Sequence, residues 1–599
     1  MTTPAKFTKE DIDQIECRFA THSVNREDGN DFHLIKHAVR LKDGRVIPTI
    51  SSKLNYERPF WVVKKGERNF NEHKEWISKD RLDEYKSTQA NLVPSIARAL
   101  QIFGRRHSLK DVCEQPYVFG ADITSTSILK HLGNQGTEVT PYSVAVYDTE
   151  TDVLHKTEEV VINTISFKDR IYTAIKASYL TGYSAPLPAI HNLINKYLGD
   201  LLKSRNATVE IEVFETEIDI IKACIKRMHE WMPDFMAVWN IEFDMDKIVE
   251  ACEKAGIKPA DLLSHPSVPN EFKHFKFIKG PAKKVTASGR VFSFKQSQRW
   301  HAVDVPSATC WIDAMQAYRQ VRGGAAEEPS YSLDAILAKH KLPAKLKFAD
   351  LDDTTAPTPN TLAWHVFMQG KYPLHYVVYN IFDCVGVELL DEATKDLQLS
   401  LPMFTGCTDF AKANSLPRKA VNALHWECLN ENKVVGCTAA EMTTDDDDDT
   451  TDVSGWIVML HPHQVTDSGL CVIEEAPDLR TNIRTHGADL DVAGAYPTNE
   501  SCLNVSKETT VLELINIKDR LGNVIPEEVV RAQTINLSGG ATNALEFCQV
   551  LFQMPTLTEV LDHYDAHSQG TAFVPEPTIG QKFILWLTGS KNSRPIRSW

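Results

Sequence analysis

Apolar runs of strand length alternate with helical patterns between about residue 140 and residue 395 of this 599-residue chain. The helical patterns cover residues 219–232, 332–341 and 374–390, and a short apolar run fills residues 235–239. Apolar residues that recur every three or four positions indicate a helix, whereas short continuous apolar runs are typical of buried strands. Since alternating strands and helices pack as a sheet covered by helices, this segment is predicted to fold as an α/β domain.

One apolar run leads directly into a pair of acidic residues. Tyr142, Val144 and Val146 are followed by Asp148 and Glu150. Side chains two positions apart on a strand point to the same side, so both carboxylates would face one ion. Carboxylate oxygens are the ligands that Mg²⁺ prefers in proteins. Taken alone, the pair could also form a solvated turn, and its interpretation depends on acidic residues further along the chain.

Two further acidic elements lie downstream in the same domain. In residues 239–244 (WNIEFD), Asn240 favours a turn after the short strand, and Asp244 lies in the first turn of a helical pattern. In residues 379–383 (YNIFD), Tyr379 and Asp383 are four positions apart and project from one helix face. Taken singly, Asp244 could cap a helix, and the other two could be a buried tyrosine and a surface aspartate.

In this order and at these separations, the three elements resemble the 3′–5′ exonuclease motifs of DnaQ-like, ribonuclease-H-like proofreading domains. The resemblance implies a ribonuclease-H-like domain that hydrolyses phosphodiester bonds with two Mg²⁺ or Mn²⁺ ions. Two ions about 4 Å apart need several carboxylates to hold them. By resemblance, Asp148 bridges both ions, Glu150 and Asp383 complete one site, Asp244 serves the other, and Tyr379 positions the attacking water.

A second resemblance begins at Asp491. Residues 491–498 (DVAGAYPT) are similar to motif A of family B DNA polymerases, with small-residue departures from its pattern. In that family the aspartate, here Asp491, binds the catalytic metals, and the tyrosine, here Tyr496, lies under the incoming sugar. Residues 58–61 and 110–123 also resemble the N-terminal domain of T-even-type phage polymerases. A structural Tyr-Pro turn is the alternative for the motif taken alone.

Neither the fingers motif Lys-x-x-x-Asn-Ser-x-Tyr-Gly nor the Tyr-x-Asp-Thr-Asp hairpin of that family follows Asp491. Without a second palm carboxylate, two metals cannot be held for nucleotidyl transfer, so this chain alone is not expected to polymerise DNA. We expect a split polymerase, in which a second chain supplies the fingers, the remaining palm and the thumb. The alternatives are a truncated polymerase whose exonuclease still works and a non-catalytic DNA-binding scaffold.

The most basic segment, residues 273–299, lies between the second and third acidic elements and contains no acidic residue. Its basic side chains are interleaved with phenylalanines, a combination that suits single-stranded nucleic acid. A β-hairpin is predicted here, with DNA contacts from Lys283, Lys284, Arg290 and Lys295. In the polymerases that the chain resembles, a hairpin in this region helps to separate the primer end from the template. The alternative is an ordinary hairpin with buried phenylalanines and solvated lysines.

Composition and charge argue against several classes of protein. No apolar run approaches the roughly 18 residues that a membrane span needs, and the N-terminus has no signal-peptide pattern. The net charge of −15 argues against a surface coated with nucleic-acid-binding residues but leaves room for a local basic channel. The cysteines form no Cys-x-x-Cys pair, which favours reduced thiols in a cytoplasmic protein.

The chain is expected to divide into four parts. A mixed α+β N-terminal domain covers residues 1–135, the exonuclease domain covers 136–400, a helical linker with a solvated acidic loop covers 401–453, and a partial palm covers 454–599. The expected partners are primer–template DNA with single-stranded 3′ ends, the second polymerase chain and a sliding clamp, and no membrane.

Overall fold

The structure is a computed structural model, and it describes most of the chain up to residue 437 and four short strands beyond it. The described ranges are 8–25, 27–68, 76–102, 107–134, 137–285, 291–322, 327–351, 353–402 and 413–437, then 472–473, 476–480, 534–537 and 540–543. The chain divides into two compact units, Met1–Asp447 and Asp448–Trp599. Arg290, the acidic loop at 445–449, Asp491, Tyr496 and most of the predicted palm lie outside the described residues.

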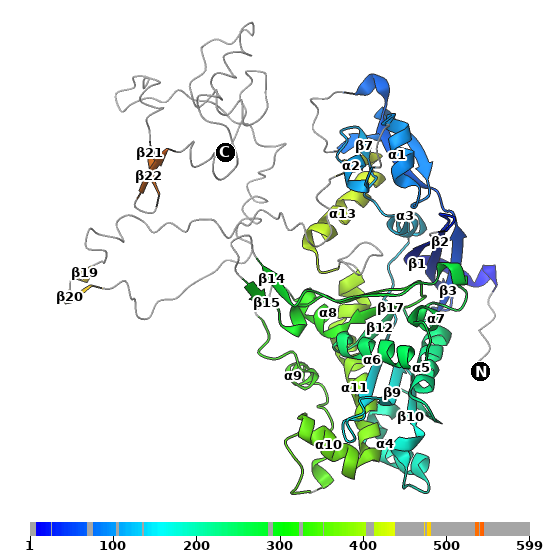
Figure 1. Cartoon of the computed structure of the whole chain (residues 1–599), viewed down its shortest axis with the longest axis vertical. Helices are drawn as coiled ribbons and strands as arrows, with labels where there is room; N and C mark the ends of the chain where they lie inside the picture. Colours follow the sequence, from blue (N-terminus) through cyan, green and yellow to red (C-terminus); the bar gives the residue numbers. More distant parts are fainter. Residues whose placement is uncertain are drawn as a thin grey trace. The chain divides into compact units, whose positions relative to one another are not determined.

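A six-stranded mixed sheet forms the centre of the predicted α/β domain (Figure 1). Its order is β11 (Thr208–Phe214), β10 (Arg170–Lys176), β9 (Val160–Phe167), β8 (Val144–Thr151), β12 (Phe235–Val238) and β17 (Cys310–Asp313). Strands β8, β9 and β10 are antiparallel neighbours, whereas β12 runs parallel to both β8 and β17, and β11 runs parallel to β10. The α/β prediction for this part of the chain is therefore confirmed.

Successive residues of β8 face opposite layers of helices. Val144 and Val146 belong to the core that contains buried residues of α4 (Pro186–Ser204) and α11 (Pro373–Thr394). Ala145 and Tyr147 belong to the core on the other face, with α5 (Glu217–Trp231) and α6 (Ile241–Lys254). Because side chains alternate along a strand, the next even-numbered positions of β8 face α11 and the next odd-numbered position faces α6.

The other α-helices that the structure describes in this domain are short. They are α7 (Pro259–Leu263), α8 (Ala314–Val321), α9 (Leu333–Lys339) and α10 (Leu362–Lys371). The helices predicted at 219–232, 332–341 and 374–390 correspond to α5, α9 and α11, and the strand predicted at 235–239 corresponds to β12. These elements are confirmed, with end residues shifted by a few positions.

The N-terminal part combines two antiparallel sheets with short helices, as predicted for a mixed α+β domain. One sheet contains β1 (Ile12–Val24), β2 (Asp31–Leu41) and β3 (Val46–Leu54), and the other contains β4 (Arg58–Val63), β6 (Leu82–Ser87) and β7 (Val118–Phe119). The helices are α1 (Leu92–Leu100), α2 (Leu109–Cys113) and α3 (Ser125–Gly133).

The chain returns to this N-terminal part after the α/β domain. Helix α13 (Leu416–Asn430) precedes β18 (Lys433–Val435), which pairs antiparallel with β5 (Trp76–Ser78). Val434 is fully buried in one core with Trp61 and Phe119. Gly120 has a φ of +67°, and a Cβ there would meet the Trp61 ring at 2.6 Å, so the close approach requires glycine. The segment predicted as a helical linker thus supplies the last strand of the N-terminal core.

A buried network of charged side chains joins the N-terminal part to the central sheet. Arg18 on β1 and Lys36 on β2 are each 1% exposed, and both lie near Asp234, which precedes β12. The Arg18 Nε lies 3.4 Å from one carboxylate oxygen of Asp234, and the Lys36 Nζ lies 3.9 Å from the other. Asp234 also accepts hydrogen bonds from the amide and the hydroxyl of Ser143, both at 2.8 Å.

No helix among the described residues is long and apolar enough to cross a membrane. In the second unit, the described strands form two antiparallel pairs. These are β19 (Val472–Ile473) with β20 (Ala476–Arg480), and β21 (Thr534–Leu537) with β22 (Gly540–Asn543).

Candidate metal centre

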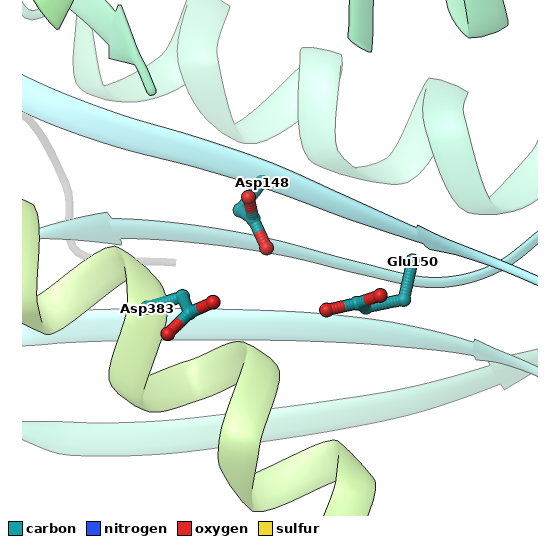
Figure 2. Close-up of side chains that lie close together, drawn as sticks. All are labelled: Asp148, Glu150 and Asp383. Carbon is teal, nitrogen blue, oxygen red and sulfur yellow. The ribbon is translucent and has the colours of Figure 1, made fainter. Parts of the chain in front are cut away.

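Three carboxylates that are far apart in the sequence converge between β8 and α11. Asp148 and Glu150 extend from the strand toward Asp383 on the helix (Figure 2). Oxygens of all three lie within 4.8 Å of one another, a spacing that suits coordination of one metal ion. Asp383 is buried, whereas Asp148 and Glu150 each keep part of their residue surface exposed. The predicted placement of Asp148 and Glu150 on one side of their strand is confirmed, and both lie near the end of β8, which closes at Thr151.

Hydrogen bonds from one helix hold the two acidic residues of the strand. The Asn380 Nδ2 donates to an Asp148 oxygen at 2.6 Å, and the Tyr376 hydroxyl donates to a Glu150 oxygen at 2.6 Å. Both donors lie on α11, the helix that also supplies Asp383. Among the described residues, the Asp383 Oδ1 is buried and has no hydrogen-bond partner.

The protein environment disfavours negative charge on this cluster as long as no cation balances it. Burial raises the pKa of Glu150 to about 8, and nearby Asp383 adds to the rise. Burial, together with the charges of Asp244, Glu150 and Asp383, raises the pKa of Asp148 well above its usual value. A divalent cation would offset this repulsion and fill the position that the unpartnered Asp383 oxygen faces. The donor set, all carboxylate oxygens, fits a hard ion such as Mg²⁺ or Mn²⁺.

Asp244 approaches the cluster from the opposite layer of helices. Asn240 adopts a left-handed conformation with φ of 75°, which allows the sharp turn between β12 and α6. Asp244 follows in the first turn of α6 and accepts hydrogen bonds from the Thr149 amide at 2.9 Å and the Thr149 hydroxyl at 2.6 Å. Burial raises the pKa of Asp244 to about 7, although the Thr149 hydrogen bonds oppose the rise. Asp244 thus lies beside Asp148 but outside the described group of three carboxylates that converge within 4.8 Å.

Tyr379 lies one helical turn before Asp383, as its spacing predicted. Its hydroxyl is 3.0 Å from the Lys345 ammonium, which also donates to Asp383 at 2.6 Å. Burial raises the pKa of the Tyr379 phenol, with the charge of Asp383 contributing, so the hydroxyl keeps its proton. A cavity of about 80 Å³ adjoins this group and is lined in part by Trp239, Lys345 and Asp383.

Four residues of this site, Lys345, Tyr376, Asn380 and Thr149, were not predicted from the sequence. Lys345 lies in an irregular segment after α9, and no periodic pattern links it to Asp383. Tyr376 and Asn380 could have been found, because they lie seven and three residues before Asp383 and therefore on its side of the helix. The alternation of β8 likewise places Thr149 on the face of Asp244.

The predicted basic hairpin is present, and its base is tied to the start of α6. Strands β14 (Lys283–Val285) and β15 (Val291–Ser293) pair antiparallel, and Lys283, Lys284 and Lys295 are exposed. Arg299 donates a bidentate pair of hydrogen bonds to the Glu242 carboxylate at 2.8 and 3.1 Å, and Gln296 donates to the same carboxylate at 2.7 Å.

Lys279 lies in the same basic segment and binds Asp246 of α6 at 2.6 Å. Arg299 and Lys279 are therefore engaged with acidic groups of α6.

No family model matches the chain, and no curated protein shows a significant match to it.

Proposed function

We propose that this protein is a metal-dependent 3′–5′ exodeoxyribonuclease, with the carboxylate cluster as its active site. The observation that carries the proposal is the convergence of Asp148, Glu150 and Asp383 around a position where a buried carboxylate oxygen has no partner in the described part of the chain. Asp148 and Glu150 come from a strand, and Asp383 comes from a helix far along the chain. The meeting of such carboxylates in one site is what a metal-dependent hydrolase requires.

The arrangement suggests how two divalent ions would be held. Glu150 and Asp383 would complete one site with Asp148, and Asp244 would share Asp148 in a second site on the α6 side. When bound, two such ions generate a hydroxide-like nucleophile near neutral pH and neutralise charge on the phosphate. The Tyr379 hydroxyl, oriented by Lys345, is placed to hold a water molecule beside Asp383.

The sheet supports a ribonuclease-H-like assignment for this domain. Its central strand β8 has an antiparallel neighbour on one side and parallel strands on the other, and it carries the first acidic pair. The third acidic element lies on a long helix packed against that strand.

The direction in which a DNA strand is degraded, and the dependence of that degradation on a metal ion, test this proposal. With Mg²⁺, a single strand labelled at its 5′ end should yield a ladder that shortens from the 3′ end, and a phosphorothioate at the last linkage should slow the first cleavage. Chelation with excess EDTA should stop the reaction, and re-addition of Mg²⁺ or Mn²⁺ should restore it. A non-catalytic scaffold would bind the strand and leave it intact under all these conditions.

The hairpin lysines are expected to hold single-stranded DNA. Replacing Lys283, Lys284 and Lys295 by alanine should weaken binding by about 10-fold or more at low salt, since each removes a phosphate contact. The slope of log affinity against log salt should also become shallower, because fewer counterions are released. Fluorescence anisotropy with a labelled oligonucleotide measures both. An unchanged salt slope would contradict a role for these residues at the phosphates.

We further propose, from the resemblance at Asp491 and Tyr496, that the chain is one part of a split family B polymerase. A second chain carrying the fingers motif and the Asp-Thr-Asp hairpin should restore primer extension when it is mixed with this protein. Asp491→Ala should abolish the extension and leave the exonuclease intact. If no neighbouring reading frame encodes such a chain, the truncated exonuclease is the better proposal.

A further inference from the structure

A chain of hydrogen bonds leads from helix α10 into the carboxylate cluster. The His365 Nδ1 lies 2.7 Å from the Tyr376 hydroxyl oxygen, and that hydroxyl donates to the Glu150 Oε2 at 2.6 Å. Tyr376 is 1% exposed, and its ring is stacked on Tyr379 with 5.5 Å between ring centroids and 8° between planes. The phenol therefore has little freedom to turn away from Glu150.

The donor and acceptor of each hydrogen bond in this series follow from the number of protons on the tyrosine hydroxyl. A tyrosine hydroxyl has one proton, and when Glu150 is ionised Tyr376 donates that proton to the carboxylate, so His365 then donates its Nδ1 proton to the phenol oxygen. Burial lowers the pKa of His365 to about 4, with Lys345 contributing, which keeps the ring neutral. Both donors consequently point toward the carboxylate.

We propose that Tyr376 and His365 are positioning residues that fix the Glu150 carboxylate for a bound divalent cation. Tyr376 holds one oxygen of Glu150 and leaves the other to the ion, and His365 holds the phenol in the donating orientation. Partners of this kind set the orientation of a metal ligand, and their loss commonly weakens metal binding by about 10- to 100-fold. The role of the cation in hydrolysis rests on the proposed exonuclease function, but the positioning of Glu150 does not.

Direct metal binding by the full-length protein tests the inference. Mn²⁺ binding measured by isothermal titration calorimetry should be about 10- to 100-fold weaker in Tyr376→Phe, which keeps the ring and removes only the hydroxyl. His365→Leu should weaken binding in the same direction. His365→Asn should retain more of it, because the asparagine amide can still donate to the phenol. Tyr172→Phe is the matched control, since Tyr172 also donates to a glutamate, Glu212, at 2.6 Å but lies across the sheet from the cluster.

The nuclease assay separates positioning from a general loss of structure. In Tyr376→Phe, the Mg²⁺ concentration for half-maximal activity should rise by the same factor as the Mn²⁺ dissociation constant. Saturating Mg²⁺ should recover much of the rate, and the KM for DNA should stay unchanged. A merely structural role would lower the rate at every Mg²⁺ concentration.

Each possible result bears on one proposal or the other. Wild-type Mn²⁺ affinity in Tyr376→Phe would overturn the positioning role, as would failure of the wild-type protein to bind Mn²⁺. Weakened Mn²⁺ binding in a protein whose wild type binds Mn²⁺ but does not degrade DNA would support the positioning role and overturn only the exonuclease proposal.

Discussion

Replacing Asp148 and Glu150 together by alanine is expected to reduce degradation of single-stranded DNA by on the order of 10³-fold or more. Loss of a partner that only orients a metal ligand costs about 10- to 100-fold, and loss of two ligands of the same ion should cost more. Asp148 is also the residue that both ions would share, so the substitution should remove both metal sites at once. The rate of shortening of a 5′-labelled strand at saturating Mg²⁺ measures the effect.

The chain offers a closely matched control for this experiment. Glu210 and Glu212 are also two residues apart on a strand, β11, but they lie at the edge of the sheet and contact Arg227 and Tyr172. Alanine at both positions removes the same charge in the same spacing and should leave the rate near that of wild type. Equal activity in the Asp148–Glu150 variant and in wild type would exclude the carboxylate cluster as the active site.

Asp234→Ala is expected to destabilise the first unit by about 3–5 kcal/mol, the usual penalty when one partner of a buried charge network is removed. Asp234 is 3% exposed and lies between Arg18 and Lys36, which are themselves buried. The alanine variant also loses the two hydrogen bonds from Ser143. Urea unfolding followed by tryptophan fluorescence should show an earlier transition with a similar slope.

Asp13→Ala provides the control, because Asp13 pairs with Arg40 at 2.7 Å but is 46% exposed at its side chain. Exposed ion pairs contribute at most about 1 kcal/mol, so its unfolding midpoint should move little. Similar shifts in the two variants would show that the buried network does not hold the N-terminal part to the central sheet.

The stability loss in Asp234→Ala should also depend on pH. Burial lowers the pKa of Lys36 to about 8, and Asp234 opposes that lowering. Without Asp234 the pKa falls further, so Lys36 can lose its proton in the folded state while the unfolded chain keeps it. Since stability rises with pH where the unfolded state binds more protons, the deficit of the variant should be smaller at pH 9 than at pH 7.

Patterns within single elements predicted a large share of the fold and of the site. The helical patterns of residues 219–232 and 374–390 identified α5, which buries one apolar stripe, and α11, which is buried on nearly all sides. Strand alternation placed Asp148 and Glu150 on one face, and helical spacing placed Tyr379 beside Asp383. Such predictions need only the geometry of one strand or one helix.

Features that depend on packing between distant segments were not predictable in this way. Lys345 reaches Asp383 from an irregular segment, and His365 reaches Tyr376 from a different helix. In the sequence, Asp234 resembles any polar residue before a strand. It contributes to stability only in the folded protein, where β1 and β2 bring the cations Arg18 and Lys36 close to it. The pairing of β18 with β5 joins segments more than 350 residues apart, and nothing in either segment specifies the other.

That last pairing has a consequence for the order in which the protein can mature on the ribosome. The first residues to be synthesised cannot complete their own core until Val434 has emerged, since Trp61 and Phe119 pack against it. The α/β domain, by contrast, has all six strands and α11 available once residue 394 has emerged from the ribosome. Contacts between distant segments form late because a long loop must first close. The N-terminal domain is therefore expected to be synthesised first and to fold last. Its apolar surface stays exposed until the α/β domain, which lies between its segments in the sequence, has been synthesised.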